Sequence, residues 1–60
     1  MSENFYTGGN EYFIVFERGT HHICVVDYNC NPRIFTGSYE KCLQEKERII
    51  ADNADYDYNL

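Results

Sequence analysis

Four side chains of the types that bind metals or act as nucleophiles lie close together in the sequence: His21, His22, Cys24 and Cys30. Zinc sites usually take their ligands in spaced pairs such as C-x-x-C, and this spacing matches no such pattern. Adjacent residues of a strand point to opposite faces of a sheet, so His21 and His22 cannot easily ligate one ion. We therefore expect no metal and no cofactor, and we interpret the cluster as a polar strand start beside a buried cysteine.

A cysteine–histidine nucleophile would draw on the same residues. Such a catalyst needs an oriented base and an oxyanion site, and a chain of 60 residues has little room for a substrate cleft. Cys24 and Cys42 stand at apolar positions, where cysteine is usually an unreactive small hydrophobic residue. The acidic residues lie in polar stretches where no carboxylate pair would be desolvated. We expect no catalytic residue and no enzymatic activity.

Length and composition favour a single small binding domain. A chain of 60 residues buries only about 60% of the surface of its unfolded form, so its stability is marginal. Six tyrosines and four phenylalanines exclude a fully disordered chain despite a net charge of −5. The same charge argues against direct binding of DNA or RNA, whose phosphates attract lysine and arginine. It favours a protein partner with a basic surface.

The cysteines and the apolar stretches indicate in which part of the cell the protein is located. Three cysteines at wide spacing do not resemble the even, dense set of a secreted disulfide scaffold. The start of the chain lacks the basic residues and the apolar run of a signal peptide. The longest apolar stretch, Tyr12 to Phe16, is far too short to span a membrane. We therefore expect a cytoplasmic protein with free thiols and no membrane contact.

A small α+β fold must position these residues, and the sequence predicts a three-stranded antiparallel sheet followed by one helix packed on one face. Strands are expected at Glu11–Glu17, His21–Tyr28 and Arg33–Thr36, from their β-branched and aromatic content and the turn residues between them. Ser38 is expected to cap a helix from Tyr39 to about Ala51, in which apolar residues recur at helical spacing.

The chain is expected to form one domain over residues 1–60. Residues 1–10 end in two glycines and are interpreted as a flexible lead-in with no core-forming pattern. Residues 11–51 supply the β-β-β-α core, and residues 52–60 form a polar, acidic tail.

Both faces of the predicted sheet are apolar, and this feature favours self-association. On the first strand Tyr12, Ile14 and Phe16 point to one face, and Phe13 and Val15 point to the other. One helix covers only one face, so apolar area on the order of several hundred Å² would stay exposed. Either the N-terminal segment or the acidic tail folds back over it, or a second copy or an obligate partner covers it. We favour a homodimer or an obligate partner.

The acidic residues of the helix and tail are the predicted partner-binding surface. In an extended chain, carboxylates two residues apart lie roughly 6.6 Å from each other, comparable to phosphates along one strand of DNA. Tyrosines between them can imitate stacked bases. The alternative is a solvated terminus that only keeps the protein soluble. The residues assigned to partner binding are Glu40, Glu45, Glu47, Asp52, Asp55, Tyr56, Asp57 and Tyr58.

The order of elements resembles very small host-takeover proteins encoded by phages, above all the uracil-DNA glycosylase inhibitors of short-tailed Bacillus phages. The resemblance covers about residues 11 to 50: strands at Glu11–Glu17 and Ile23–Cys30, then an aromatic–Gly–cap start of the helix at Phe35-Thr36-Gly37-Ser38. It implies a dimeric DNA mimic that inhibits a host DNA-processing protein. That family has a Phe-Glu pair where this chain has Asn31-Pro32-Arg33-Ile34, so no contact residue is carried over.

The start of the helix, Gly37-Ser38-Tyr39-Glu40-Lys41-Cys42-Leu43, also resembles antitoxins of the HicB type. Small phage inhibitors of host RNA polymerase and anti-CRISPR proteins share the same general layout. We therefore expect an inhibitor that binds a host or defence protein with a basic nucleic-acid-binding surface. The alternative is an antitoxin-like, anti-CRISPR or polymerase-inhibiting module whose partner contact is apolar.

Overall fold

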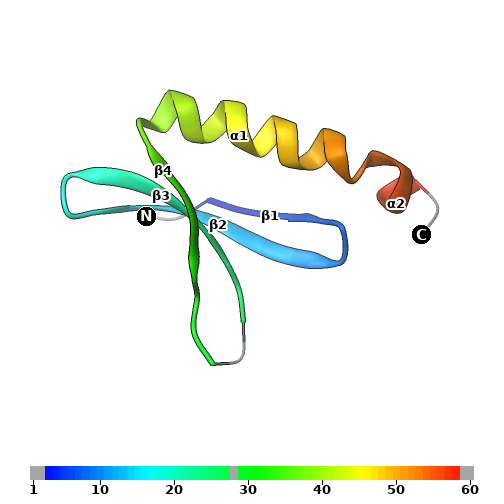
Figure 1. Ribbon diagram of the computed structural model, residues 1–60, viewed down its shortest axis with the longest axis horizontal. Helices are drawn as coiled ribbons and strands as arrows, with labels where there is room; N and C mark the ends of the chain where they lie inside the picture. The colour runs from blue at the N-terminus through cyan, green and yellow to red at the C-terminus, as the bar shows by residue number, and fades with distance from the viewer. Residues whose placement is uncertain (1–2, 28, 59–60) are drawn as a thin grey trace.

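A computed structural model describes residues 3–27 and 29–58 of the chain. These residues form a four-stranded antiparallel sheet with a helix packed on one face (Figure 1), which confirms the predicted α+β class. The strands are β1 (Glu3–Thr7), β2 (Asn10–Glu17), β3 (Thr20–Val25) and β4 (Arg33–Gly37), and the helices are α1 (Tyr39–Asp52) and the short α2 (Ala54–Tyr58). The strand order in the sheet, β1-β2-β3-β4, follows the order in the chain.

The predicted number of three strands is wrong, because residues 3–7 add a fourth strand at the edge of the sheet. Gly8 and Gly9 make the two-residue turn to β2 with φ angles of 61° and 78°, which glycine adopts without steric cost. Phe5 pairs with Tyr12 in the register and stacks on its ring at a centroid distance of 5.0 Å. Burial of this one phenylalanine in the core holds an otherwise polar segment in the sheet.

The other three strands lie where the sequence predicts them, within a few residues at each end. The turn between β2 and β3 consists of Arg18 and Gly19, both with positive φ. A bulge between Ile23 and Cys24 shifts the register of β3 against β4. The predicted end of the second strand, Tyr28, lies outside the described residues.

Helix α1 begins as predicted, because the Ser38 side chain accepts a hydrogen bond from the backbone N–H of Lys41 at 3.2 Å. It ends at Asp52, one residue beyond the expected end. The residues that follow were predicted to form a polar, acidic tail, without a regular element. Residues 54–58 turn into the short helix α2 instead.

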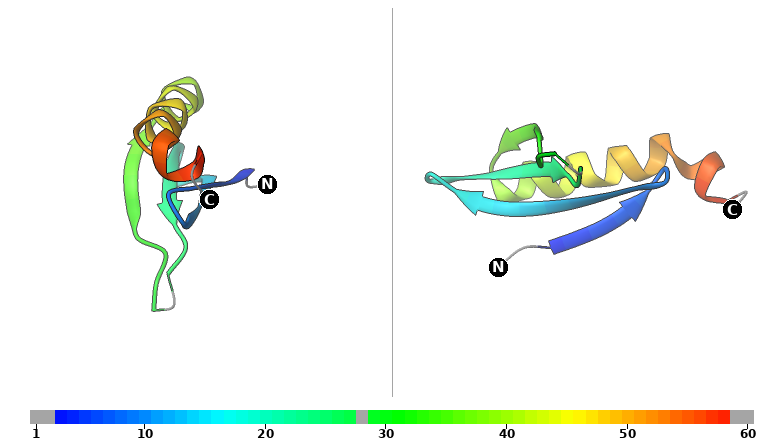
Figure 2. Two further views of the ribbon diagram at one scale, coloured as in Figure 1. Left: turned by 90° about the vertical axis from the view of Figure 1, so that its right-hand side faces the viewer. Right: turned by 90° about the horizontal axis from the view of Figure 1, so that it is seen from below.

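The core lies between α1 and one face of the sheet. It consists of Phe5, Ile14, Ile23, Cys42 and Ile49, with four partly buried apolar side chains around them. Seen from below in Figure 2, the strands lie in front of α1, so the opposite face of the sheet is turned toward the viewer. Both helices lie on the same side of the sheet, so residues 3–27 and 29–58 form two layers.

Candidate binding surfaces

Helix α2 is attached to the turn between β1 and β2 through Asp57. The hydroxyl of Thr7 donates a hydrogen bond to one carboxylate oxygen at 2.5 Å, and the backbone N–H of Gly8 donates to the other at 2.8 Å. Thr7 is only 3% exposed, so its hydroxyl depends on a partner within the chain. Asp57, which the sequence assigned to partner binding, therefore also makes contacts within the chain.

The same turn is in close contact with residues that follow α1. A Cβ atom added at Gly8 would lie 2.6 Å from the side-chain oxygen of Asn53, and one added at Gly9 would lie 3.0 Å from the hydroxyl of Tyr56. A side chain at Gly8 would therefore force Asn53 to shift, and one at Gly9 would press on the end of the Tyr56 side chain; both positions also have the positive φ that favours glycine. We call the contacts of Thr7, Gly8, Asn53 and Asp57 the C-terminal latch.

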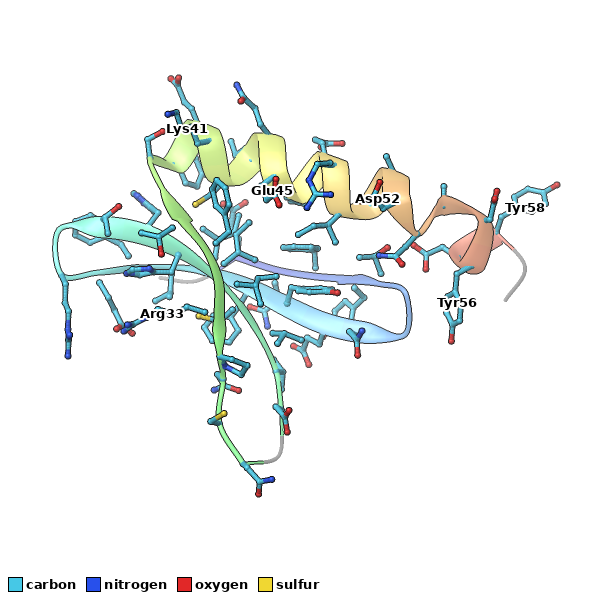
Figure 3. All side chains as sticks on the ribbon, viewed as in Figure 1. Arg33, Lys41, Glu45, Asp52, Tyr56 and Tyr58 are labelled. Carbon is cyan, nitrogen blue, oxygen red and sulfur yellow. The ribbon has the colours of Figure 1, made fainter. Side chains whose placement is uncertain are left out.

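Two further acids of the predicted surface are neutralised by one arginine. Arg48 donates to both carboxylate oxygens of Glu45, at 2.9 and 2.5 Å, and to Asp52 at 2.6 Å. The hydrogen bond from Arg48 holds the pKa of Glu45 below its usual value. Arg48 lies three positions after Glu45 and four before Asp52, the spacing at which helical side chains meet. Glu45 and Asp52 are labelled on α1 in Figure 3.

The remaining predicted residues lie in two places: two glutamates along α1, and three residues on α2. Glu40 and Glu47 are exposed on α1 and seven residues apart, so they share one side of the helix at a separation of roughly 10 Å. Asp55 is exposed on α2. Tyr56 and Tyr58 project from α2 in different directions (Figure 3), and Tyr58 is 88% exposed. The regular ladder of carboxylates expected for an extended tail does not form, because the segment is helical.

The second candidate surface is the face of the sheet turned away from α1, which we call the open face. The register assigns to it Asn4, Tyr6, Glu11, Phe13, Val15, Glu17, Thr20, His22, Cys24, Arg33 and Thr36. Phe13 and Val15 are half-buried near its centre, and Tyr6 is 72% exposed at one side. The second face is therefore mixed and less apolar than the sequence predicted, because polar side chains surround Phe13 and Val15.

Hydrogen bonds of His22 and Arg33 organise the polar part of the open face. The buried ring of His22 has Nδ1 at 2.8 Å from the hydroxyl oxygen of Thr36 and Nε2 at 3.3 Å from the carbonyl oxygen of Glu17. In the neutral tautomer that fits both contacts, Nε2–H donates to the carbonyl and Nδ1 accepts from Thr36. Arg33 reaches from β4 to the Glu17 carboxylate at 2.9 Å. A hollow of about 440 Å³ beside this pair is lined by Phe13 and Cys24.

At the opposite corner of the open face, Glu11 accepts two hydrogen bonds on one carboxylate oxygen. The side-chain amide of Asn4 donates at 2.7 Å, and the hydroxyl of Tyr6 donates at 3.1 Å. The bond to Glu11 raises the pKa of Tyr6. Both carboxylates of this face, Glu11 and Glu17, are therefore engaged within the chain.

The structure separates the residues that the sequence placed in one metal-type cluster. His21 lies on the helix side of the sheet, opposite to His22, as the alternation of a strand requires. Within residues 3–27 and 29–58, no three side chains of metal-ligating types are close enough together to hold an ion. All three cysteines are free, and burial raises the pKa of the Cys24 and Cys42 thiols.

A row of aromatic rings lies near the β2–β3 turn, on the face of the sheet that α1 covers, and it was not predicted. His21 lies between Phe16 and Tyr39, with ring centroids 4.9 and 5.2 Å away, and Phe16 is 58% exposed. The Tyr39 hydroxyl donates to the carboxylate of Glu3, which raises the pKa of Tyr39. The two-residue turn Arg18-Gly19 fixes Phe16 opposite His21, and this register could have been inferred from the sequence.

Comparisons with known proteins do not supply a relative. The chain matches no protein-family model, and no curated protein or solved structure is significantly similar to it. None of the helices in the described part of the chain has the length and apolar character needed to cross a membrane. Function must therefore be inferred from the surfaces themselves.

Proposed function

We propose that this protein is a non-catalytic inhibitor of the phage type, which binds a host or defence protein through its acidic helical layer. The observation that carries the proposal is the row of Glu40 and Glu47 on the outer side of α1, in a chain of net charge −5. Their separation of roughly 10 Å corresponds to about three base-pair steps of 3.4 Å along DNA. A basic surface that binds nucleic acid would be attracted to this row.

The exposed tyrosines of α2 extend this surface. Tyr56 and Tyr58 present aromatic rings beside Asp55 at the end of the helical layer. Tyrosine is enriched among the residues that dominate protein interfaces, and its ring also resembles a base in area and stacking. Together with the layout of strands and helix, these features lead us to propose uracil-DNA glycosylase as the target, in the cytoplasm of the host cell.

The proposal is tested by the inhibition of bacterial uracil-DNA glycosylase on a uracil-containing oligonucleotide. Inhibition is expected at low salt and should weaken steeply as salt rises, because the contact is electrostatic. The double variant Glu40→Gln, Glu47→Gln should inhibit less and show a flatter salt dependence. The double variant Glu11→Gln, Asp27→Asn removes the same charge from the sheet side and should inhibit like the unmodified protein.

Two outcomes would contradict the proposal. Absence of inhibition at micromolar protein and low salt would exclude the glycosylase as the target. Equal loss of inhibition in the helical and the sheet-side double variants would mean that total charge, and not the row on α1, determines binding.

A second candidate function is an antitoxin-like, anti-CRISPR or polymerase-inhibiting module with an apolar partner contact. The aromatic row of Phe16, His21 and Tyr39 favours it, because two of these rings are exposed and all are held in contact with one another. Such a contact would keep its affinity as salt rises. Replacement of Phe16 by serine would weaken it, whereas the helical double variant would not.

A further inference from the structure

Strand β1 is an edge of the sheet, and no other segment within residues 3–27 and 29–58 pairs with its outer side. Its one neighbour in the strand order is β2, and the right-hand view of Figure 2 shows it as the outermost strand, with neither helix beyond it. Natural proteins usually protect edge strands with proline, a bulge or exposed charges. The opposite edge has all three, since Pro32 precedes β4, Arg33 begins it, and a bulge interrupts its pairing with β3. β1 has no proline and no bulge, and its one charged side chain, Glu3, is bonded to Tyr39.

Alternate residues of β1 direct their backbone N–H and C=O groups outward from the sheet. In a two-residue hairpin the residues that flank the turn, here Thr7 and its register partner, exchange hydrogen bonds, and every second pair before them does the same. The backbone groups of Tyr6 and Asn4 therefore face away from β2. The carbonyl oxygen of Glu11, the register partner of Tyr6, fits this pattern, because it accepts a hydrogen bond from the N–H of Val26 at 2.8 Å, on the side away from β1. The outward groups of Asn4 and Tyr6 can pair with an added strand.

A hollow of about 620 Å³ lies at the turn end of this edge. Its size is within the range of about 300–1,000 Å³ that is common for ligand sites. The residues that line it are Tyr6, Thr7, Gly9, Asn10, Glu11 and Asp57. Tyr6 is 72% exposed, and the face of a tyrosine ring attracts cations. Neighbouring side chains on one face of two paired strands lie about 5 Å apart, so a side chain of an added strand beside Tyr6 would enter the hollow.

The charges at the hollow favour a basic occupant. The hydrogen bonds that Glu11 and Asp57 accept come from neutral donors: one side-chain amide, two hydroxyls and one backbone N–H. The ion pairs within residues 3–27 and 29–58 are made by Arg33 and Arg48 with other carboxylates. Both carboxylates at the hollow therefore keep a negative charge that no cation of the described chain balances. An arginine or lysine side chain would be attracted to them and to the ring of Tyr6.

The helix side of β1 favours a different kind of residue. The ammonium nitrogen of Lys46 lies 5.5 Å from the centre of the Phe5 ring, on the side of the sheet that α1 covers. A basic side chain of an added strand would be repelled there, whereas an apolar one would pack beside the core. Because side chains of a strand alternate between the two faces, the matching segment has basic residues at every second position and apolar residues between them.

We propose that β1 binds an extended segment of a partner protein by strand addition, with a basic side chain of that segment in the hollow beside Tyr6. Backbone hydrogen bonds to the edge give affinity in this mode of recognition, and the pockets for alternate side chains give specificity. The inference goes beyond the proposed function, because it concerns a second site at the edge of the sheet. It depends neither on the row of Glu40 and Glu47 nor on the identity of the inhibited protein.

A blocked seven-residue peptide of alternating arginine and valine is the probe, and isothermal titration calorimetry at physiological salt measures its dissociation constant. Two further peptides carry N-methyl groups on either all arginines or all valines. Each of them keeps N–H groups along one edge alone, so strand addition predicts that only one of the two binds. Equal binding of both would overturn the proposal, because backbone pairing would then not contribute. This comparison uses the unmodified protein and does not depend on the folding of a variant.

Variants of the protein test the edge and the charge separately. Asn4→Pro removes an outward N–H without breaking the pairing with β2, and Asn4→Ala removes the same side chain but keeps that N–H. We expect the dissociation constant of Asn4→Pro to be at least about fivefold higher than that of Asn4→Ala. Glu11→Gln should raise it at least about threefold, whereas the double variant Glu40→Gln, Glu47→Gln should change it less than about twofold, because salt screens distant charges. Circular dichroism establishes that each variant is folded.

Three other results would overturn the proposal. The first is a peptide of alternating glutamate and valine that binds as tightly as the arginine peptide, because the charges at the hollow would then select nothing. The second is tighter binding of a peptide with the sequence of residues 3–7, because the edge would then pair with a second copy of this chain. The third is an equal effect of Glu11→Gln and the helical double variant, because the peptide would then respond to total charge and not to the hollow.

Discussion

Replacement of Asp57 by alanine removes both hydrogen bonds through which α2 is attached to the sheet. The hydroxyl of Thr7 and the backbone N–H of Gly8 lose a charged acceptor, and a hydrogen bond to a charged group contributes about 1.5–3 kcal/mol. Water replaces part of this contribution because Asp57 is only half-buried. We therefore expect the free energy of unfolding to fall by about 2 kcal/mol for the two bonds together.

This loss is large for so small a protein. A domain of 60 residues has a free energy of unfolding of about 3–9 kcal/mol. A decrease of about 2 kcal/mol should lower the melting temperature by about 10 °C. Urea unfolding followed by circular dichroism measures the free energy, and a thermal scan measures the shift in melting temperature.

Two further variants separate the hydrogen bonds from the charge. Glu47→Ala removes the same charge from an exposed position on α1 and should change stability by less than about 0.5 kcal/mol. Thr7→Val removes the donor, and its effect should be smaller when Asp57 is already alanine, with a coupling of about 1 kcal/mol. Equal stability of Asp57→Ala and Glu47→Ala would refute the reasoning, because α2 would then not be held by Asp57.

Two other predictions concern the cysteines and the glycine turns. Burial raises the pKa of the Cys24 and Cys42 thiols, so at pH 8 less of each is thiolate, and iodoacetamide should modify the exposed Cys30 first in the folded protein. Mass spectrometry of timed samples checks this order, and equal rates would contradict it. Gly8→Ala should destabilise the protein more than Gly19→Ala. Both have positive φ, but only at Gly8 would a Cβ atom meet a side chain, at 2.6 Å. Urea unfolding of both variants tests this difference, and equal losses would contradict it.

The elements that the sequence predicted correctly are those determined by local patterns. The strands β2 to β4 are runs rich in β-branched and aromatic residues between recognisable turns, and Ser38 has the side chain that caps a helix. The pairing of Arg48 with Glu45 and Asp52 was also accessible from the sequence, because these residues lie at helical contact spacing.

Strand β1 was missed because its alternation is weak. Phe5 is its only apolar residue that enters the core, and Tyr6 points to the open face. The useful signal was the pair Gly8-Gly9, which can form a two-residue hairpin turn and was interpreted as a sign of flexibility.

The position of the C-terminal segment could not be derived from local patterns. Its attachment depends on a contact between Thr7 and Asp57, which are 50 residues apart in the chain. Nothing in the composition of the segment distinguishes an acid that binds a hydroxyl in its own chain from one that faces solvent. The contact of Asp57 with Thr7 was not predicted for this reason.

The sequential strand order has a consequence for the kinetics of folding. Because every strand pairs with its neighbour in the chain, most contacts form between residues close in sequence, and such topologies fold fast. The contact of Thr7 with Asp57 spans 50 residues and closes the largest loop of the latch, so it forms after the hairpins and α1 have assembled. Loss of a contact that forms late accelerates unfolding and leaves the rate of folding almost unchanged. The short C-terminal helix therefore sets how long the native state persists, while the hairpins set how quickly it is reached.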